Sequence, residues 1–315
     1  MVIVVDQHIP FIVEAVQKEW PQVDIFPLKP EEIDASAVKD ADVLIVRTRT
    51  RADASLLEGS QVRMVCTATI GFDHIDTAYC ESHGIRWMSC PGCNAQAVCD
   101  YIEEAIEEFS HQPSAISRQT IGVVGVGHVG SLVAKMAERK GLKVLLNDPP
   151  KGMGVSLKEI AAQCDIITFH VPLDKTTHHL CDAEFLQQCK PDALIINAAR
   201  GGVVDEKALL ASGHPYILDT WENEPHIDAN VLHHALLASM HIAGYSLEGK
   251  RNASQMCLDA IAVEWGLPKI NLQSPISNIQ SPIGDSSPGW LSRISEQLKA
   301  HPEQFEQLRK NYVLR

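Results

Sequence analysis

The chain has 315 residues, is 45% hydrophobic and 21% charged, and carries a formal net charge of −13 at pH 7. This length accommodates about two domains with sizeable cores, and the acidic balance argues against nucleic acid as the main partner, because it would repel a phosphate backbone. No apolar run reaches the roughly 18 residues of a membrane span, and the first residues, MVIVVDQH, lack the basic region of a signal peptide. We therefore expect a cytoplasmic protein without a membrane partner, whose nine cysteines are reduced and mostly buried.

Short apolar runs alternate with helical patterns along most of the chain. Three predicted strands come first, at 2–6, 41–47 and 63–69. Six more follow, at 120–127, 143–148, 164–172, 192–200, 216–221 and 239–244. Strands interleaved with helices predict βαβ units and parallel sheets covered on both faces, so the predicted fold class is α/β.

A pair of cysteines in CPGCNA, residues 90–95, has the spacing of half a zinc site or of a redox pair. No second C-x-x-C or C-x-x-H lies nearby to complete a tetrahedral zinc site, and the motif does not open a thioredoxin-like helix. Pro91 and Gly92 are typical of a turn, and Asn94 or its neighbour could cap the helix predicted at 95–110. We therefore interpret the segment as a hinge loop and expect no metal.

A glycine-rich turn follows the predicted strand at 120–127 and precedes a helical pattern. It has the G-x-G-x-x-G spacing in which glycines permit a tight turn, let the backbone approach a pyrophosphate, and let the helix pack on the strand. The candidate cofactor contacts in this turn are Gly125, Gly127, His128 and Val129, and Gly130 completes the motif.

An acidic residue, Asp148, ends the next predicted strand, 21 positions after Gly127. A carboxylate there accepts hydrogen bonds from the adenosine ribose and repels a 2′-phosphate, which indicates NAD rather than NADP. Asp148 also precedes Pro149, so a turn role is an alternative that is compatible with the first.

The order of these segments predicts two doubly wound parallel-sheet domains. A Rossmann NAD-binding domain at 99–265 is inserted into a flavodoxin-like substrate-binding domain made of 1–98 and 266–285, and a tail at 286–315 follows. The helical patterns at 95–110 and 246–265 would connect the two domains.

Three charged residues follow successive predicted strands of the second set. Arg200, Glu224 and His241 would meet where ligands bind in open α/β sheets. The guanidinium of Arg200 suits a carboxylate, and a histidine paired with a carboxylate suits a base. Each also has an ordinary interpretation: a surface ion pair, a turn carboxylate and a half-buried histidine.

Four motifs, GVGHVG, INAARGGVVDEKAL, LDTWENEP and HIAG, together resemble the D-isomer-specific 2-hydroxyacid dehydrogenases. The resemblance implies that Arg200 binds the carboxylate and 2-oxygen of the substrate, and that Glu224 and His241 form the acid/base pair. It also implies that Asp219 contacts the nicotinamide side of NAD, with further cofactor contacts at Val171, Ala198, Ala199 and Gly244.

Finer motifs at 67–76, 91–98, 145–150, 241–250 and 305–315 resemble one branch of that family, which acts on a phosphorylated four-carbon hydroxy acid. This resemblance implies substrate contacts at Thr48, Thr69 and Tyr245. It also implies a homodimer, in which 286–315 is a reduced dimerisation segment. Two alternatives stay open: a dehydrogenase of a phosphorylated three-carbon acid, and a non-catalytic NAD(H)-sensing regulator of the same fold.

The segment RTRTR, residues 47–51, fits a phosphorylated substrate independently. If it is extended, Arg47, Arg49 and Arg51 share one face and could bind a phosphate. A solvated basic turn is the alternative, and Arg47 is the favoured ligand of the three.

Overall fold

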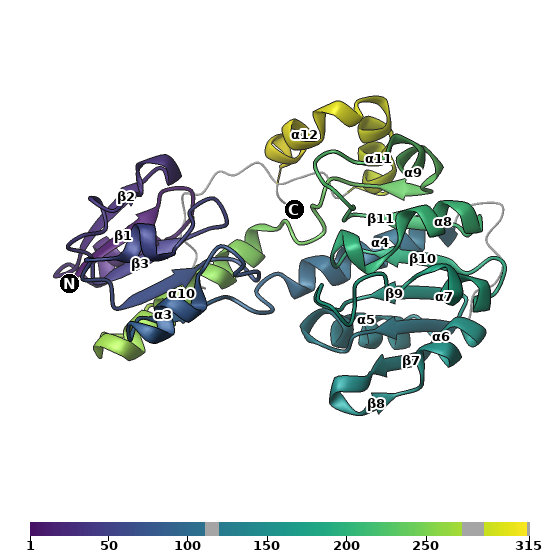
Figure 1. Ribbon diagram of the computed structural model, residues 1–315, viewed down its shortest axis with the longest axis horizontal. Coiled ribbons are helices and arrows are strands. Elements are labelled where there is room, and N and C mark those ends of the chain that lie inside the picture. The colour runs from purple at the N-terminus through teal and green to yellow at the C-terminus, as the bar shows by residue number, and fades with distance from the viewer. Residues whose placement is uncertain (111–119, 273–286, 314–315) are drawn as a thin grey trace. The chain divides into compact units, whose positions relative to one another are not determined.

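The computed structural model describes residues 1–110, 120–272 and 287–313 of the chain (Figure 1). Within them the chain forms two compact units. The first contains residues 1–94 and 246–272, and the second contains residues 95–110, 120–245 and 287–313. In the described residues no helix is both long and apolar enough to cross a membrane.

The first unit is built on a five-stranded parallel sheet. Its strands are β1 (Val2–Asp6), β2 (Asp24–Leu28), β3 (Val43–Val46), β4 (Met64–Thr67) and β5 (Arg86–Met88). They lie in the order β2-β1-β3-β4-β5 and every neighbouring pair is parallel. This is the strand order of a flavodoxin-like domain, the type of domain expected from the sequence.

Helices cover both faces of that sheet, because its strands are apolar on both sides. The helices are α1 (Ile12–Glu19), α2 (Ala54–Leu57), α3 (Thr77–Ser82) and α10 (Leu247–Trp265). Ile3 and Val5 pack in one core with residues of α1 and α10, and Val4 packs in a second core with residues of α2 and α3. Alternate residues of one strand thus bury opposite faces.

The second unit is built on a seven-stranded sheet. Its strands are β6 (Thr120–Val124), β7 (Lys143–Asp148), β8 (Met153–Gly154), β9 (Ile166–Phe169), β10 (Leu194–Asn197), β11 (Tyr216–Leu218) and β12 (Leu237–Ala238). The order is β12-β11-β10-β9-β6-β7-β8, and only the short β8 is antiparallel. The order reverses between β6 and β9, as in a Rossmann domain, which confirms the predicted fold class.

The helices of this unit are α4 (Ala95–Ser110), α5 (His128–Arg139), α6 (Leu157–Gln163), α7 (Ala183–Gln188), α8 (Glu206–Ser212), α9 (Ala229–His234), α11 (Trp290–Ala300) and α12 (Phe305–Asn311). One core cluster joins helices and sheet. The apolar residues of α11 and α12, including Trp290, Leu291 and Phe305, are part of it. Ser295 of α11 also accepts a hydrogen bond from the backbone of Ala238 in β12 (2.9 Å). The tail expected to be a dimerisation segment therefore packs on the second unit of its own chain.

One connecting helix lies in a different unit from the expected one. The sequence places 246–265 with the NAD-binding domain, whereas α10 groups with the first unit. The physical reason is its buried face: Ala253, Cys257, Leu258 and Ile261 share a core with β1 and β3. The observed divisions fall at residues 94/95 and 245/246, not at 98/99 and 265/266.

The two cysteines of CPGCNA lie in the first unit and are buried. The Cys90 thiol donates to Thr67 O and Ala253 O (3.3 Å each), and its Sγ is 3.8 Å from Cys257 Sγ. Burial raises the pKa of Cys93 to about 12, so this thiol stays protonated. Of the two candidates for capping the next helix, Asn94 or its neighbour, Asn94 does not do so through its Oδ1, which is buried without a hydrogen-bond partner in the described part of the chain.

Candidate active site

The three glycines of the G-x-G-x-x-G turn have different surroundings. Gly125 has φ +87°, and a Cβ there would lie 2.6 Å from His170 O. A Cβ on Gly130 would lie 1.9 Å from Gly125 O, whereas one on Gly127 would meet nothing within 4 Å. Gly125 and Gly130 are therefore required by the turn and by helix packing, and the space at Gly127 is open to a ligand.

Among the described residues, no side chain caps the N-terminus of α5. Gly127 is its N-cap and supplies no side chain to satisfy the first backbone N–H groups. His128 and Val129 form the first turn of the helix, where exposed N–H groups and the helix dipole favour a phosphate.

Asp148 ends β7 beside this turn and is buried. Its Oδ2 accepts a hydrogen bond from Val126 N (2.9 Å), and Lys151 Nζ lies 3.7 Å away. The carboxylate is thus held next to the glycine turn by one oxygen, which fits a role at the adenosine ribose. Together the open N-terminus, the space at Gly127 and this acid fit a dinucleotide.

The other predicted cofactor contacts also lie at the carboxyl ends of strands. Val171 follows β9, and its Cγ1 lies beside Gly125. Ala198 and Ala199 follow β10, where the Asn197 side chain accepts from Ala199 N (3.0 Å). Gly244 lies in the loop after β12. The residues predicted to contact the cofactor thus follow the strands at the edge where ligands bind in parallel sheets.

His241 and Glu224 form a close pair in the second unit. Nδ1 of His241 lies 2.6 Å from Oε1 of Glu224, and the two side chains are 27% and 25% exposed. If the carboxylate accepts from Nδ1–H, the Nε2 atom is left to accept a proton from a ligand. The second oxygen of Glu224 is buried without a hydrogen-bond partner among the described residues.

Asp219 holds the loop that carries His241. Its Oδ1 accepts from Ser239 Oγ (2.6 Å) and Ile242 N (2.7 Å), and its Oδ2 accepts from Ala243 N (3.0 Å). The strand expected at 239–244 is therefore wrong: β12 ends at Ala238. Ser239 N and His241 N still donate to the backbone carbonyls of Leu218 and Asp219, but the next two N–H groups, of Ile242 and Ala243, bond to the buried Asp219 carboxylate, so the chain turns away from the ladder. His241 itself has φ +57°. Sequence patterns did not reveal this role of Asp219.

Arg200 lies at the start of a 3-10 helix, Gly201–Val203, directly after β10. Its Nη1 donates to Ala199 O (2.7 Å). A Cβ on Gly201 would lie 2.0 Å from Trp221 O, so the Arg200 loop closely approaches the loop that carries Glu224. The structure thus places Arg200, Glu224 and His241 on the loops after β10, β11 and β12, which are neighbours in the sheet.

Tyr245 is contacted from the tail of the chain. Arg309 in α12 donates through Nε to the Tyr245 hydroxyl (3.0 Å). The sequence predicted a substrate contact at Tyr245 but gave no signal for Arg309, because the two are 64 positions apart.

In the first unit, Arg47 is paired with a buried acid. Its Nε lies 2.8 Å from Asp6 Oδ2 and its Nη2 lies 3.2 Å from Asp6 Oδ1. Burial acts to raise the pKa of Asp6, but hydrogen bonds from Arg47 and from the His8 backbone, with the charge of Arg47, lower it overall. Asp6 therefore fixes the direction of the guanidinium.

The three arginines of RTRTR do not share a face. Thr50 N donates to Arg47 O (3.1 Å), so the segment turns after β3 instead of extending. Arg51 bonds to Asp53 (2.8 Å), and Arg49 is exposed. Of the two alternatives for this segment, the turn is therefore the one formed, and Asp6 holds Arg47 at the strand end.

Lys250 in α10 is a second cation of the first unit, and its charge interacts with that of Arg47. Its pKa is lowered by burial of the ammonium group and by the positive charge of Arg47. Sequence reasoning did not single out Lys250, because residues 47 and 250 come together only through the fold of the first unit.

The two predicted substrate threonines follow strands of this unit. Thr48 is exposed in the turn after β3. Thr69, after β4, donates to Gly71 O (2.8 Å) and lies 2.6 Å from the Thr67 hydroxyl, which in turn contacts His74 Nε2 (2.9 Å). Burial lowers the pKa of His74, which favours a neutral ring in this network.

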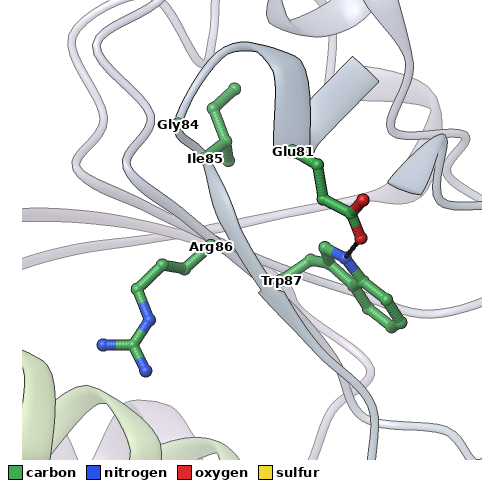
Figure 2. Close-up of a pocket in the computed structure, with 5 residues that line it drawn as sticks. All are labelled: Glu81, Gly84, Ile85, Arg86 and Trp87. Atoms are coloured by element: carbon green, nitrogen blue, oxygen red, sulfur yellow. Dashed lines mark hydrogen bonds between the residues drawn. The ribbon is translucent and has the colours of Figure 1, made fainter. Parts of the chain in front are cut away.

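A hollow elsewhere in the first unit is lined by Glu81, Gly84, Ile85, Arg86 and Trp87 (Figure 2). Figure 2 shows the indole of Trp87, which donates to Glu81 Oε1 (3.3 Å). The hollow surrounds the start of edge strand β5, whereas parallel strands bind ligands at their carboxyl ends. We therefore do not assign it to the active site.

Comparison with known proteins gives one family match and several close relatives. Residues 99–243 match the D-isomer specific 2-hydroxyacid dehydrogenase, NAD binding domain. The erythronate-4-phosphate dehydrogenase of Bacteroides fragilis is 43% identical, over all of this chain and 97% of its own length. The protein of that name from Bacteroides thetaiotaomicron is 41% identical with the same coverage.

Solved structures agree on the fold. The cofactor (NAD+)-bound 3-phosphoglycerate dehydrogenase of Entamoeba histolytica is 25% identical with a TM-score of 0.69, over 86% of this chain and 98% of its own. The TT0316 protein from Thermus thermophilus is similar to the same degree, with a TM-score of 0.69 over 86% of this chain and 99% of its own.

Proposed function

Because the chain belongs to the erythronate-4-phosphate dehydrogenase family, within the D-isomer-specific 2-hydroxyacid dehydrogenases, we propose that it oxidises 4-phospho-D-erythronate. The product is the 2-oxo acid, 3-hydroxy-2-oxo-4-phosphobutanoate, and the pathway is pyridoxal 5′-phosphate biosynthesis. The chain is an NAD-dependent oxidoreductase, since the matched segment is the NAD-binding domain of this family.

The observation that carries this proposal is the His241–Glu224 pair (2.6 Å), formed between the loops after β12 and β11, with Arg200 on the loop after the next strand, β10. Arg200 binds the substrate carboxylate through its planar guanidinium. His241 Nε2 accepts the proton of the 2-hydroxyl, and the charge of Glu224 stabilises the resulting imidazolium. Bound NAD supplies the hydride acceptor.

The cofactor would be held by the residues predicted for it. The N-terminus of α5 would bind the pyrophosphate and Asp148 the adenosine ribose. Asp219 uses both carboxylate oxygens to hold the His241 loop. Its proposed contribution at the nicotinamide end is therefore chiefly to keep that loop in place.

Recognition of the substrate phosphate is proposed for Arg47, with Lys250 as a second cation near it. Two like charges near each other repel, so an anion between them is stabilised by both. Asp6 keeps Arg47 at the end of β3, and the hydroxyls of Thr48 and Thr69 would add hydrogen bonds.

The test is NADH formation with 4-phosphoerythronate and with 3-phosphoglycerate, in the presence of a 2-oxo acid that regenerates NAD. We expect a clear preference for the four-carbon acid, and its loss in His241→Ala. A preference for phosphoglycerate would identify the three-carbon acid as substrate. Tight NADH binding with neither acid oxidised would support a regulator instead.

We also propose that the chain acts as a homodimer in the cytoplasm. The support is the likeness of 305–315 to the C-terminal segment of the family branch, although α11 and α12 pack on their own unit. Sedimentation equilibrium of the full chain tests this: a single species of twice the 34.6 kDa chain mass is expected, and a monomer contradicts it.

A further inference from the structure

The C-terminal helix α12 brings a cation to the predicted substrate tyrosine. Two residues anchor the helix in the core of the second unit: Phe305, 1% exposed, and Leu308, 8% exposed. The next residue, Arg309, is half-buried and donates through Nε to the Tyr245 hydroxyl (3.0 Å). Its guanidinium carbon also lies 5.7 Å from the centre of the Tyr245 ring.

The direction of this hydrogen bond fixes what the tyrosine can do. A guanidinium N–H can only donate, so the Tyr245 oxygen is the acceptor. The hydroxyl proton is then available to another acceptor, and none is bonded to it among the described residues. A positive charge on the oxygen side also makes the phenol a stronger donor. An anionic oxygen is the partner that gains most from such a donor.

Arg309 is also electrostatically coupled to the catalytic pair. Burial acts to lower its pKa, but the interactions with Tyr245, and the charges of Glu224 and Glu306, raise it overall. Glu306 lies 3.3 Å from Arg309 Nη1 on the same helix and holds the other end of the guanidinium. Arg309 is therefore oriented by its own helix and directed at the loops that carry Tyr245 and Glu224.

We propose that Arg309 is a positioning residue for the substrate: it holds the Tyr245 hydroxyl so that its proton points to an anionic oxygen of the phosphorylated hydroxy acid. Arg309 acts through Tyr245 and takes no part in hydride or proton transfer. The inference rests on the proposed function, and it assigns to the C-terminal helix a role in substrate recognition within the chain's own second unit.

The first test replaces Arg309 by methionine, which keeps the stem packed over the ring but removes the donor and the charge. Lys310→Met is the matched control, because it removes a neighbouring exposed charge that has no contact with Tyr245. For 4-phosphoerythronate we expect Arg309→Met to raise KM about tenfold, which corresponds to about 1.4 kcal/mol. The value of kcat should change less than about twofold, and NADH affinity should not change.

A double-mutant cycle with Tyr245→Phe separates action through the hydroxyl from general support of the fold. In the Tyr245→Phe background, Arg309→Met should change KM by less than about twofold. An equal rise of KM in both backgrounds, or the same rise in Lys310→Met, would overturn the proposal. Activity of the unmodified chain on the substrate tests the proposed function separately, since it does not depend on any variant.

If Arg309→Met also lowers the melting temperature, Arg309→Lys provides the decisive comparison. Lysine keeps the charge and suits the helix but lacks the planar Nε donor. A KM between those of the unmodified chain and Arg309→Met, with normal melting, supports the positioning role. The positioning role is contradicted if KM is unchanged in Arg309→Lys and activity is lost only in variants whose melting temperature falls.

Discussion

The two sheets present their functional side chains in different ways. In the second unit, backbone contacts place the groups: a buried carboxylate binds the N–H groups after His241, and Gly201 lets the Arg200 loop approach the Glu224 loop. In the first unit, ionic pairing places Arg47 against Asp6. Geometry fixed by the backbone leaves a sequence signature of glycines and strand-end acids, whereas a pair of side chains 41 positions apart leaves none.

The largest effect is expected from substitutions that break the catalytic pair of the second unit, His241 and Glu224. His241→Ala should lower kcat about 10²–10⁴-fold, because it removes the proton acceptor. Glu224→Gln should lower it less, about 10–100-fold, since the base remains but its partner charge is lost. NADH binding should persist in both variants. Steady-state kinetics with fluorescence titration of NADH check this, and a Glu224→Gln enzyme of full activity would show that the pair is not the acid/base couple.

The glycine turn gives the next comparison, between two substitutions of the same kind. In Gly130→Ala the new Cβ would lie 1.9 Å from Gly125 O, so the fold must shift, at a cost of about 1–3 kcal/mol or more. Gly127→Ala meets nothing within 4 Å and has an ordinary φ of −83°, so melting should be normal. NADH affinity should nevertheless fall about tenfold, because the methyl enters the space for the pyrophosphate. Equal NADH affinity in Gly127→Ala and the unmodified chain would contradict the assignment.

These glycines show how much the sequence could predict. The G-x-G-x-x-G turn, Asp148 and the three charged strand-end residues could be singled out from the sequence because each follows a strand in a fixed order. The strand at 239–244 was wrong because the buried Asp219 carboxylate binds the N–H groups of residues 242 and 243. At RTRTR the turn alternative is the one formed, because Thr50 N bonds locally to Arg47 O. Arg309 and Lys250 were missed because their neighbours are distant in the sequence.

A buried acid beside the catalytic loop should make stability depend on pH. Burial raises the pKa of Glu206 to about 7, although a hydrogen bond from Glu222 N (2.6 Å) opposes the shift. Since the folded-state value lies above the ordinary 4.5, the folded chain binds the extra proton between the two values. The contribution of Glu206 to the free energy of unfolding is therefore complete below about pH 4.5. This contribution is lost as the pH rises through about 7, and the loss is about 3 kcal/mol at most.

Chemical denaturation at several pH values measures this dependence, with Glu206→Gln as the comparison. The amide cannot ionise, so the variant should lose the fall in unfolding free energy between pH 4.5 and about 7 that we assign to Glu206. Identical slopes for the two chains would show that Glu206 is not the group responsible.

The smallest expected effect concerns the first unit. Asp6→Asn leaves the shape of the acid but removes the charge that holds Arg47, so the guanidinium becomes less well directed. KM for the phosphorylated acid should rise about three- to tenfold with little change in kcat. Arg51→Met is the control, since Arg51 is bound to Asp53 and is not assigned to the phosphate. A rise of the same size in Arg51→Met would indicate a general effect of charge.

The measurement that tests the central claim most directly is a single turnover with 4-phosphoerythronate carrying deuterium at C2. The enzyme, with NAD bound, is expected to transfer the deuterium to the nicotinamide, and His241→Ala should transfer almost none in the same time. We predict that mass spectrometry detects deuterium in the reduced cofactor with the unmodified chain and not with His241→Ala. A chain that binds NAD and the substrate but leaves the label on C2 would contradict the account.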